Sequence, residues 1–80
     1  MPHLELRYYA QLREEARTGT ELLQTEAASP ASLYEQLRAR HGFSLPASVM
    51  KVAVNARFCD WDRPLHDGDT VVFIPPVNGG

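Results

Sequence analysis

The residues with the clearest potential for chemistry are Gly79 and Gly80, at the end of the segment Pro75-Pro76-Val77-Asn78-Gly79-Gly80. The two prolines stiffen the start of this tail, and the two glycines leave its tip without side chains. Fully extended, residues 75–80 reach on the order of 20 Å, which is far enough to enter the active site of another protein. The carboxylate of Gly80 can be activated as an acyl-adenylate, and Gly79 lets the tail pass through a narrow tunnel. A frayed terminus that happens to contain glycines is the alternative interpretation.

No other residues form a recognisable catalytic or metal site. His3, His41 and His66 are scattered, without a cysteine or carboxylate at the spacing of metal ligands. Cys59 is the only cysteine, so an internal disulfide is excluded, and it has no cationic neighbour that would lower its thiol pKa. We predict that Cys59 is a half-buried small apolar residue near a turn. The domain is therefore not expected to catalyse a reaction by itself, or to bind a cofactor or a metal.

Length and charge limit the classes of function. At 80 residues the chain is expected to form one domain, 1–80, that buries about 60% of its unfolded surface and has no room for an enclosed active site. Eight basic and ten acidic residues give a net charge of −2 without a basic patch, which argues against nucleic acid. The absence of a signal peptide or membrane-spanning run and the single cysteine predict a cytoplasmic setting. Four aspartates lack the EF-hand spacing and are predicted to be solvated turn residues: Asp60, Asp62, Asp67 and Asp69.

The first 26 residues predict two strands joined by a short helix. His3–Tyr8 alternates between apolar and polar residues, as a half-buried strand does. Tyr9–Arg17 changes to helical spacing and is stopped by Gly19, and Thr20–Glu26 is predicted to be a second strand. The predicted buried positions are Leu4, Leu6 and Tyr8 in the first strand, and Tyr9, Leu12 and Ala16 in the helix.

The main helix is predicted to start near residue 29 and to end at Gly42. Ser29-Pro30 is a typical helix entry, and Ser32 with Glu35 offers a competing capping box one turn later. Glycine at position 42 suits the left-handed backbone at a helix C-terminus. The apolar stripe that should face a sheet consists of Leu33, Tyr34, Leu37 and His41.

Two further strands are predicted in the second half. Val49–Asn55 is rich in β-branched residues, and Asn55-Ala56 is a plausible turn into the short segment Arg57–Cys59. Asp67-Gly68 signals a turn before Thr70–Ile74, which is apolar on both faces and should lie centrally in the sheet. The two prolines that follow must end this strand, because neither can donate a ladder hydrogen bond.

The predicted order of elements fits a small α+β fold. A mixed sheet packed on one main helix, with residues 75–80 as a flexible tail, gives a β-grasp, ubiquitin-like domain. The same order would also permit a ferredoxin-like sandwich.

Three features of the second half form a recognisable pattern: Val54-Asn55, the turn Leu65-His66-Asp67-Gly68-Asp69 and the Pro-Pro-Val-x-Gly-Gly end, residues 75–80. With this pattern the second half resembles the small subunit of molybdopterin synthase, a ubiquitin-like sulfur-carrier family. In the first half, residues 8–14 are similar to the family's strand-to-helix junction, so that the likeness covers the whole chain.

The resemblance implies a sulfur-transfer cycle centred on Gly80. An E1-like activating enzyme would adenylate Gly80 with ATP, and sulfur would then replace an oxygen to give a thiocarboxylate. The large subunit of molybdopterin synthase would receive this group in its active site, and the cationic groups that hold the substrate would belong to the large subunit. Sulfur donation to cyclic pyranopterin monophosphate would build the dithiolene of molybdopterin. The implied assembly is a heterotetramer of two small and two large subunits.

Three other functions remain open at this point. A sulfur carrier of thiamine biosynthesis shares the fold and the Gly-Gly end, but such carriers usually lack the paired prolines at 75 and 76. A ubiquitin-like modifier would instead be joined to a target lysine through Gly80. A plain binding module would tolerate the loss of Gly79 and Gly80.

We also predict an apolar docking surface beside the start of the tail. Trp61 lies between Asp60 and Asp62 and is hard to bury fully in so small a domain. The alternative, that the aromatic residues belong to the core, is equally open. The predicted interface residues are Phe58, Trp61, Phe73, Pro75, Pro76 and Val77.

Overall fold

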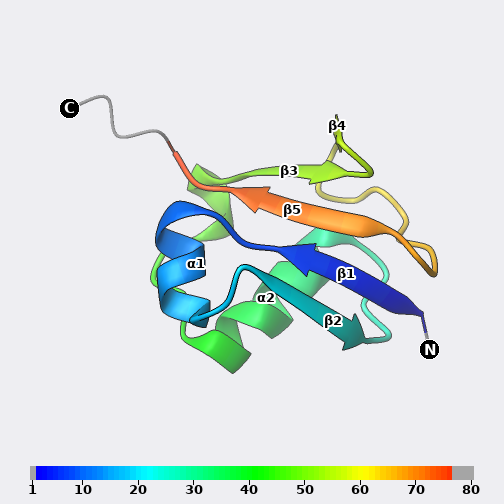
Figure 1. Ribbon diagram of the computed structural model, residues 1–80. Helices are drawn as coiled ribbons and strands as arrows, with labels where there is room; N and C mark the ends of the chain where they lie inside the picture. Colours follow the sequence, from blue (N-terminus) through cyan, green and yellow to red (C-terminus); the bar gives the residue numbers. More distant parts are fainter. Residues whose placement is uncertain (1, 77–80) are drawn as a thin grey trace.

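A computed structural model describes residues 2–76 and arranges them around one five-stranded sheet (Figure 1). The elements in chain order are β1 (His3–Arg7), α1 (Ala10–Ala16), β2 (Thr20–Gln24), α2 (Pro30–His41), the 3-10 helix η1 (Ala47–Val49), β3 (Lys51–Val54), β4 (Arg57–Phe58) and β5 (Thr70–Ile74). All the strands and both helices expected from the sequence are present. The third strand starts later than predicted, because Val49 belongs to the short helix η1 and β3 begins at Lys51.

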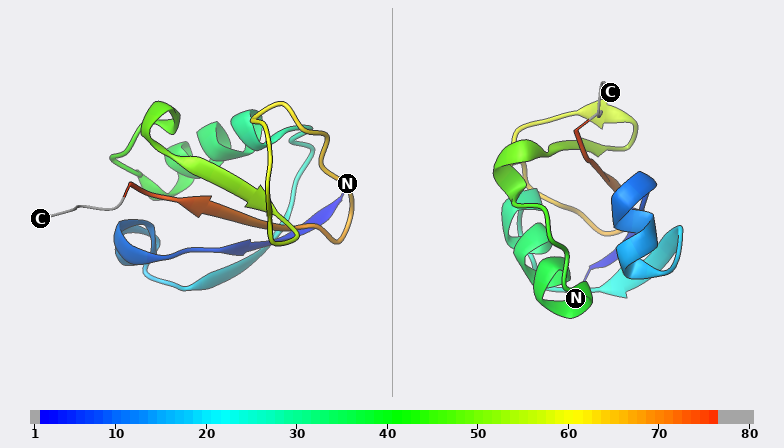
Figure 2. Two further views of the ribbon diagram at one scale, coloured as in Figure 1. Left: turned by 90° about the horizontal axis from the view of Figure 1, so that it is seen from above. Right: turned by 90° about the vertical axis from the view of Figure 1, so that its left-hand side faces the viewer.

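The sheet has the strand order β2-β1-β5-β3-β4. The first and last strands, β1 and β5, form the parallel pair at its centre, and the other pairs are antiparallel. The long helix α2 covers one face of the sheet, and α1 lies at one end of it (Figure 2). This is the predicted β-grasp architecture. The ferredoxin-like alternative is excluded, because its two split βαβ units would place two long helices on one face.

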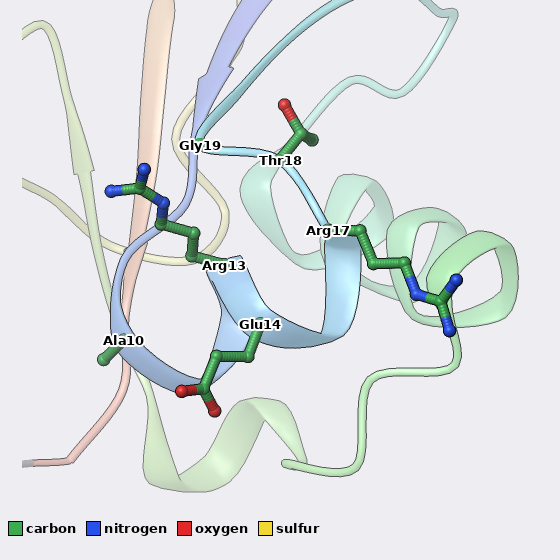
Figure 3. Close-up of a pocket in the computed structure, with 6 residues that line it drawn as sticks. All are labelled: Ala10, Arg13, Glu14, Arg17, Thr18 and Gly19. Atoms are coloured by element: carbon green, nitrogen blue, oxygen red, sulfur yellow. The ribbon is translucent and has the colours of Figure 1, made fainter.

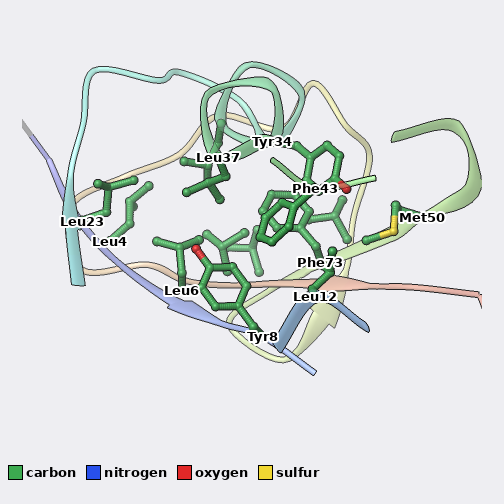
Figure 4. Close-up of a cluster of buried hydrophobic side chains, with 14 of the residues drawn as sticks. Leu4, Leu6, Tyr8, Leu12, Leu23, Tyr34, Leu37, Phe43, Met50 and Phe73 are labelled. Atoms are coloured by element: carbon green, nitrogen blue, oxygen red, sulfur yellow. The ribbon is translucent and has the colours of Figure 1, made fainter. Parts of the chain in front are cut away.

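The hydrophobic core lies between the sheet and α2 (Figure 4). Alternation directs Leu4 and Leu6 of β1 and Val71 of β5 into it, and all three side chains are fully buried. The prediction that Tyr9 is buried is wrong, because half of its surface is exposed. Its extended backbone at the N-cap of α1 leaves Leu12 as the buried residue of that short helix.

The ends of α2 follow the sequence signals. Ser29 is the N-cap, and its hydroxyl accepts from the Ser32 amide at 3.3 Å while Ser32 closes the reciprocal half of the capping box. The competing start at Ser32 is therefore wrong, since that serine already lies within the first turn. Gly42 ends the helix with φ +72°, the left-handed conformation that glycine adopts without strain.

Candidate functional site

The tail leaves the domain from the end of its central strand. Ile74, the last residue of β5, pairs with Lys51 in β3, after which Pro75 is half-buried and Pro76 is exposed. The predicted end of the strand before the two prolines is confirmed. This end of the sheet is the one beside α1 and η1 (Figures 1 and 2). The remaining predicted site residues, Val77, Gly79 and Gly80, lie outside the described residues.

A buried carboxylate fixes the start of β5. Asp69 Oδ1 accepts from Asn55 Nδ2 at 2.9 Å, and Asp69 Oδ2 accepts from the His66 amide at 2.8 Å and from Arg63 Nη1 at 3.3 Å. Burial alone would raise the pKa of Asp69, but the bonds from His66, Asn55 and Arg63 hold this pKa below its usual value. The prediction that Asp69 is a solvated turn residue is therefore wrong.

The neighbouring turn joins β5 to the start of the chain. Gly68 has φ +87°, as the Asp67-Gly68 turn signal predicted, and its amide donates to the His3 carbonyl at 2.7 Å. The Asp67 carboxylate accepts from the His3 amide, also at 2.7 Å. Asp60, Asp62 and Asp67 are exposed, as expected for turn residues. The two central strands therefore begin from one hydrogen-bonded junction.

The face of the sheet that points away from α2, called the open face below, carries apolar side chains. Phe58 pairs with Ala53 across β4 and β3, and 72% of its surface is exposed. Leu22 on β2 is 83% exposed. Between the two edge strands, β4 and β2, lies a shallow groove of about 330 Å³. It is lined by Arg7, Tyr9, Asn55, Ala56, Thr70 and Val72. Sequence reasoning identified Phe58 but missed the groove, because the groove combines residues from distant strands.

The other two aromatic residues predicted at the interface lie on the opposite face. Phe73 is fully buried against Tyr34, with ring centroids 5.0 Å apart, so its predicted place on the surface is corrected. Trp61 is half-buried and stacks on Phe73 at 5.7 Å. Side chains alternate along β5, and Phe73 points toward α2. The sequence does not reveal this direction, because β5 is apolar on both faces.

A second polar cluster joins β2 to the end of α2. Glu21 Oε1 accepts from Tyr8 Oη at 2.8 Å and lies 2.9 Å from His41 Nε2, while Glu21 Oε2 lies 2.8 Å from Arg40. Burial raises the pKa of Tyr8, and the bond to Glu21 adds to this effect. His41, predicted on the apolar stripe, is thus partly buried and hydrogen-bonded. The cluster contributes to the stability of the fold, and its residues are distant in the sequence from the tail.

The remaining candidates do not form a site. Cys59 is half-buried against the core, and burial raises the pKa of its thiol, as expected for an unreactive residue. A hollow of about 480 Å³ lies beside α1 and is lined in part by Arg13 and Arg17. Figure 3 shows that the guanidinium groups of these two residues point in different directions. Within residues 2–76, no group of three or more His, Cys, Asp or Glu side chains could hold a metal ion. None of the described helices is long and apolar enough to cross a membrane.

The fold and the end of β5 define a small β-grasp domain with a C-terminal extension from its central strand. Residues 6–80 match the family model described as the ThiS family. The chain therefore belongs to the ThiS family.

Known proteins support this assignment over nearly the whole chain. The chain is 36% identical over 84 residues to the molybdopterin synthase sulfur carrier subunit of Escherichia coli (strain K12), covering 96% of this chain and 99% of that protein. The solved structure of a putative molybdopterin converting factor, subunit 1, from Pyrococcus furiosus has a TM-score of 0.79 and 29% identity, covering 96% of this chain and all of that one.

Two more solved structures extend the comparison. The complex of subunits 1 and 2 of molybdopterin-converting factor from Helicobacter pylori 26695 contains a chain with TM-score 0.68 and 25% identity, covering 98% of this chain and 99% of that one. Caldiarchaeum subterraneum ubiquitin matches with TM-score 0.64 and 15% identity, covering 99% and 98%. The second match concerns the fold alone and confirms that it is ubiquitin-like.

Proposed function

We propose that this chain is the sulfur carrier subunit of a molybdopterin synthase and that Gly80 carries the sulfur. The observation that carries the proposal is the 36% identity to the Escherichia coli sulfur carrier over 99% of that protein's length. The root of the tail supports it, because β5 is held between β1 and β3 up to Val72 and pairs with β3 up to Ile74. A tail that starts from a fixed strand has a defined point of departure from which it can reach another protein.

The proposed chemistry takes place at the carbonyl carbon of Gly80. Its carboxylate attacks the α-phosphorus of ATP in an E1-like activating enzyme, and pyrophosphate leaves. A sulfur nucleophile then attacks the carbonyl carbon of the acyl-adenylate, AMP leaves, and a thiocarboxylate results. In the large subunit the sulfur of this group attacks cyclic pyranopterin monophosphate; water then attacks the Gly80 carbonyl carbon, the carbon–sulfur bond breaks, and Gly80 returns as a carboxylate. The chain itself contributes the reagent and its positioning, and it binds no cofactor.

We infer that the open face and the tail root together engage the partners. Phe58 and Leu22 expose apolar surface on the open face, as residues at protein interfaces do. The complex of subunits 1 and 2 from Helicobacter pylori supports a large subunit as partner, and we propose a heterotetramer with two copies of each. ATP-dependent activation and a free cysteine both suit the cytoplasm, where we place the protein.

Intact mass spectrometry tests the proposal. Incubation with an activating enzyme, ATP and sulfide should increase the mass of the wild-type chain by the difference between sulfur and oxygen. Deletion of Gly80, or one residue added after it, should prevent this increase without changing the melting temperature, because residues 2–76 retain their contacts. Gly79→Val should slow the reaction by obstructing the path of the tail into the partner.

The substrate is tested separately with the purified thiocarboxylate. Formation of molybdopterin from cyclic pyranopterin monophosphate and a large subunit is the expected result. Thiazole formation in its place would identify a thiamine-pathway carrier, and attachment to lysines of other proteins would identify a modifier. A wild-type chain that takes up no sulfur, or an extended chain that works without being trimmed, would overturn the proposal.

A further inference from the structure

The half-buried Trp61 forms one wall of a surface groove on the α2 side of the sheet. The groove is shallow and open to solvent, has a volume of about 390 Å³, and is lined by Ala31 at the start of α2, Ala47 and Ser48 in η1, and Trp61. Three of these four residues have small side chains. Because these side chains are small, the described residues leave part of the Trp61 indole uncovered. Larger side chains at the same positions would bury it.

The Trp61 side of the groove is held in place by ring packing and a hydrogen bond. The Trp61 indole stacks on Phe73 and meets Tyr34 edge to face, with ring centroids 5.7 Å and 6.1 Å away. The Trp61 carbonyl accepts from the Ala31 amide at 3.0 Å, which ties the tryptophan to the first turn of α2. A preformed apolar groove binds a side chain with a small loss of conformational entropy.

Residues next to the groove-lining residues in the chain and on α2 carry negative charge. Asp60 and Asp62 flank Trp61 in the chain, and Glu35 lies one helical turn after Ala31. All three are exposed, and none forms an ion pair within the described part of the chain. The nearby Arg63 does not neutralise them, because Asp69 holds its guanidinium. Charge complementarity therefore favours a basic occupant.

We propose that this groove is a second docking site, which binds an apolar side chain of a protein segment with basic residues on either side. The site is separate from the open face, because Trp61 packs on Phe73 beneath α2 whereas Phe58 pairs with Ala53 on the other side of the sheet. It goes beyond sulfur transfer and does not depend on the chemistry of Gly80. A carrier held through its open face still presents the groove to a second protein.

Three peptides test the site by NMR titration of the ¹⁵N-labelled full chain. The first is Arg-Arg-Leu-Arg-Arg, the second replaces its arginines with glutamates, and the third replaces its leucine with glycine. The first should shift the amide signals of Ala31, Ala47 and Ser48 and the indole signal of Trp61. The other two should bind far more weakly, because they lack the charge or the apolar anchor.

Variants of the chain distinguish binding in the groove from non-specific electrostatic attraction of the peptide. The double variant Asp60→Asn/Asp62→Asn should weaken binding of the first peptide about three- to ten-fold. Ser48→Arg should abolish it by filling the groove with a cation. Glu14→Gln, which removes an exposed charge on α1, is the matched control and should change nothing. A wild-type-like amide spectrum verifies that each variant is folded. Equal binding of the acidic peptide, shifts confined to the open face, or no shifts at all would overturn the proposal.

Discussion

Asn55 and Asp69 meet across the start of β5, with Asn55 Nδ2 donating to Asp69 Oδ1 over 2.9 Å. The same Asn55 side chain accepts from the Thr70 amide through Oδ1 at 3.0 Å. One amide group thus joins the turn after β3 to the first residue of β5. Because β5 leads to the tail, this contact fixes the first residue of the strand from which the tail leaves.

Loss of the Asp69 carboxylate should destabilise the fold. Asp69→Ala leaves the Asn55 and Arg63 donors and the His66 amide without their acceptor, at an expected cost of about 2 to 3 kcal/mol. Urea unfolding measures this cost. Asp62→Ala is the control, since Asp62 is exposed and should change stability by about 0.5 kcal/mol or less. Equal stability of the two variants would contradict the structural role of Asp69.

Asp69 should also make stability dependent on pH. Its folded-state pKa is lowered, so the unfolded chain takes up the proton first as the pH falls. The stabilisation should be complete above about pH 4, near the usual pKa of an aspartate, and should be lost as the pH falls through the folded-state value. Unfolding free energies measured between neutral and acidic pH should fall less steeply in Asp69→Asn. An unchanged slope would assign the pH dependence to other carboxylates.

The Gly68 turn should tolerate little substitution. Nothing lies within 4 Å of a Cβ added at Gly68, so the cost of Gly68→Ala comes from its φ of +87° alone, about 1 to 2 kcal/mol. Gly68→Val should cost more, because its side chain is branched at Cβ. Gly19→Ala is the control, since a Cβ there meets only the flexible Arg13 side chain, at 3.4 Å. Equal melting temperatures for Gly68→Ala and wild type would contradict the turn geometry.

Substitutions of Phe58 and Trp61 should affect different properties: the first should weaken binding, and the second should lower stability. Phe58→Ala removes an exposed side chain and should weaken binding to the large subunit by more than about 1 kcal/mol while the melting temperature stays the same. Trp61→Ala removes the stacking partner of Phe73 and should destabilise the fold by about 2 kcal/mol or more. Calorimetry of binding and thermal unfolding provide the two measurements. Unchanged binding of Phe58→Ala would remove Phe58 from the interface.

Local signals predicted most of the fold. The strand Thr70–Ile74 and the helix from Ser29 to Gly42 were found because periodicity, caps and turn residues act over a few positions. The roles of Asp69 and Glu21 could not be predicted, since their partners Asn55 and His41 lie 14 and 20 residues away. Phe73 was misplaced because a strand that is apolar on both faces does not reveal which face meets the helix.

Only part of the candidate site could be predicted from the sequence. The end of β5 before the two prolines follows from the chemistry of proline and is confirmed. The exposed Phe58 was identified correctly as a surface residue, but its neighbours on the open face come from other strands and could not be recognised. The reactivity of Gly80 stays a prediction that the experiments on the tail will test.

The central place of β5 has a consequence for biosynthesis. A ribosome makes β5 after the other four strands, yet β1 and β3 have no contact with each other in the sheet except through it. A nascent chain that stops before Thr70 cannot pair its two halves in one sheet, and apolar surface that β5 would cover stays accessible to proteases and chaperones. Folding is thereby coupled to completion of the strand that leads to the tail. Prematurely terminated chains should be degraded before they can occupy a partner as inactive competitors.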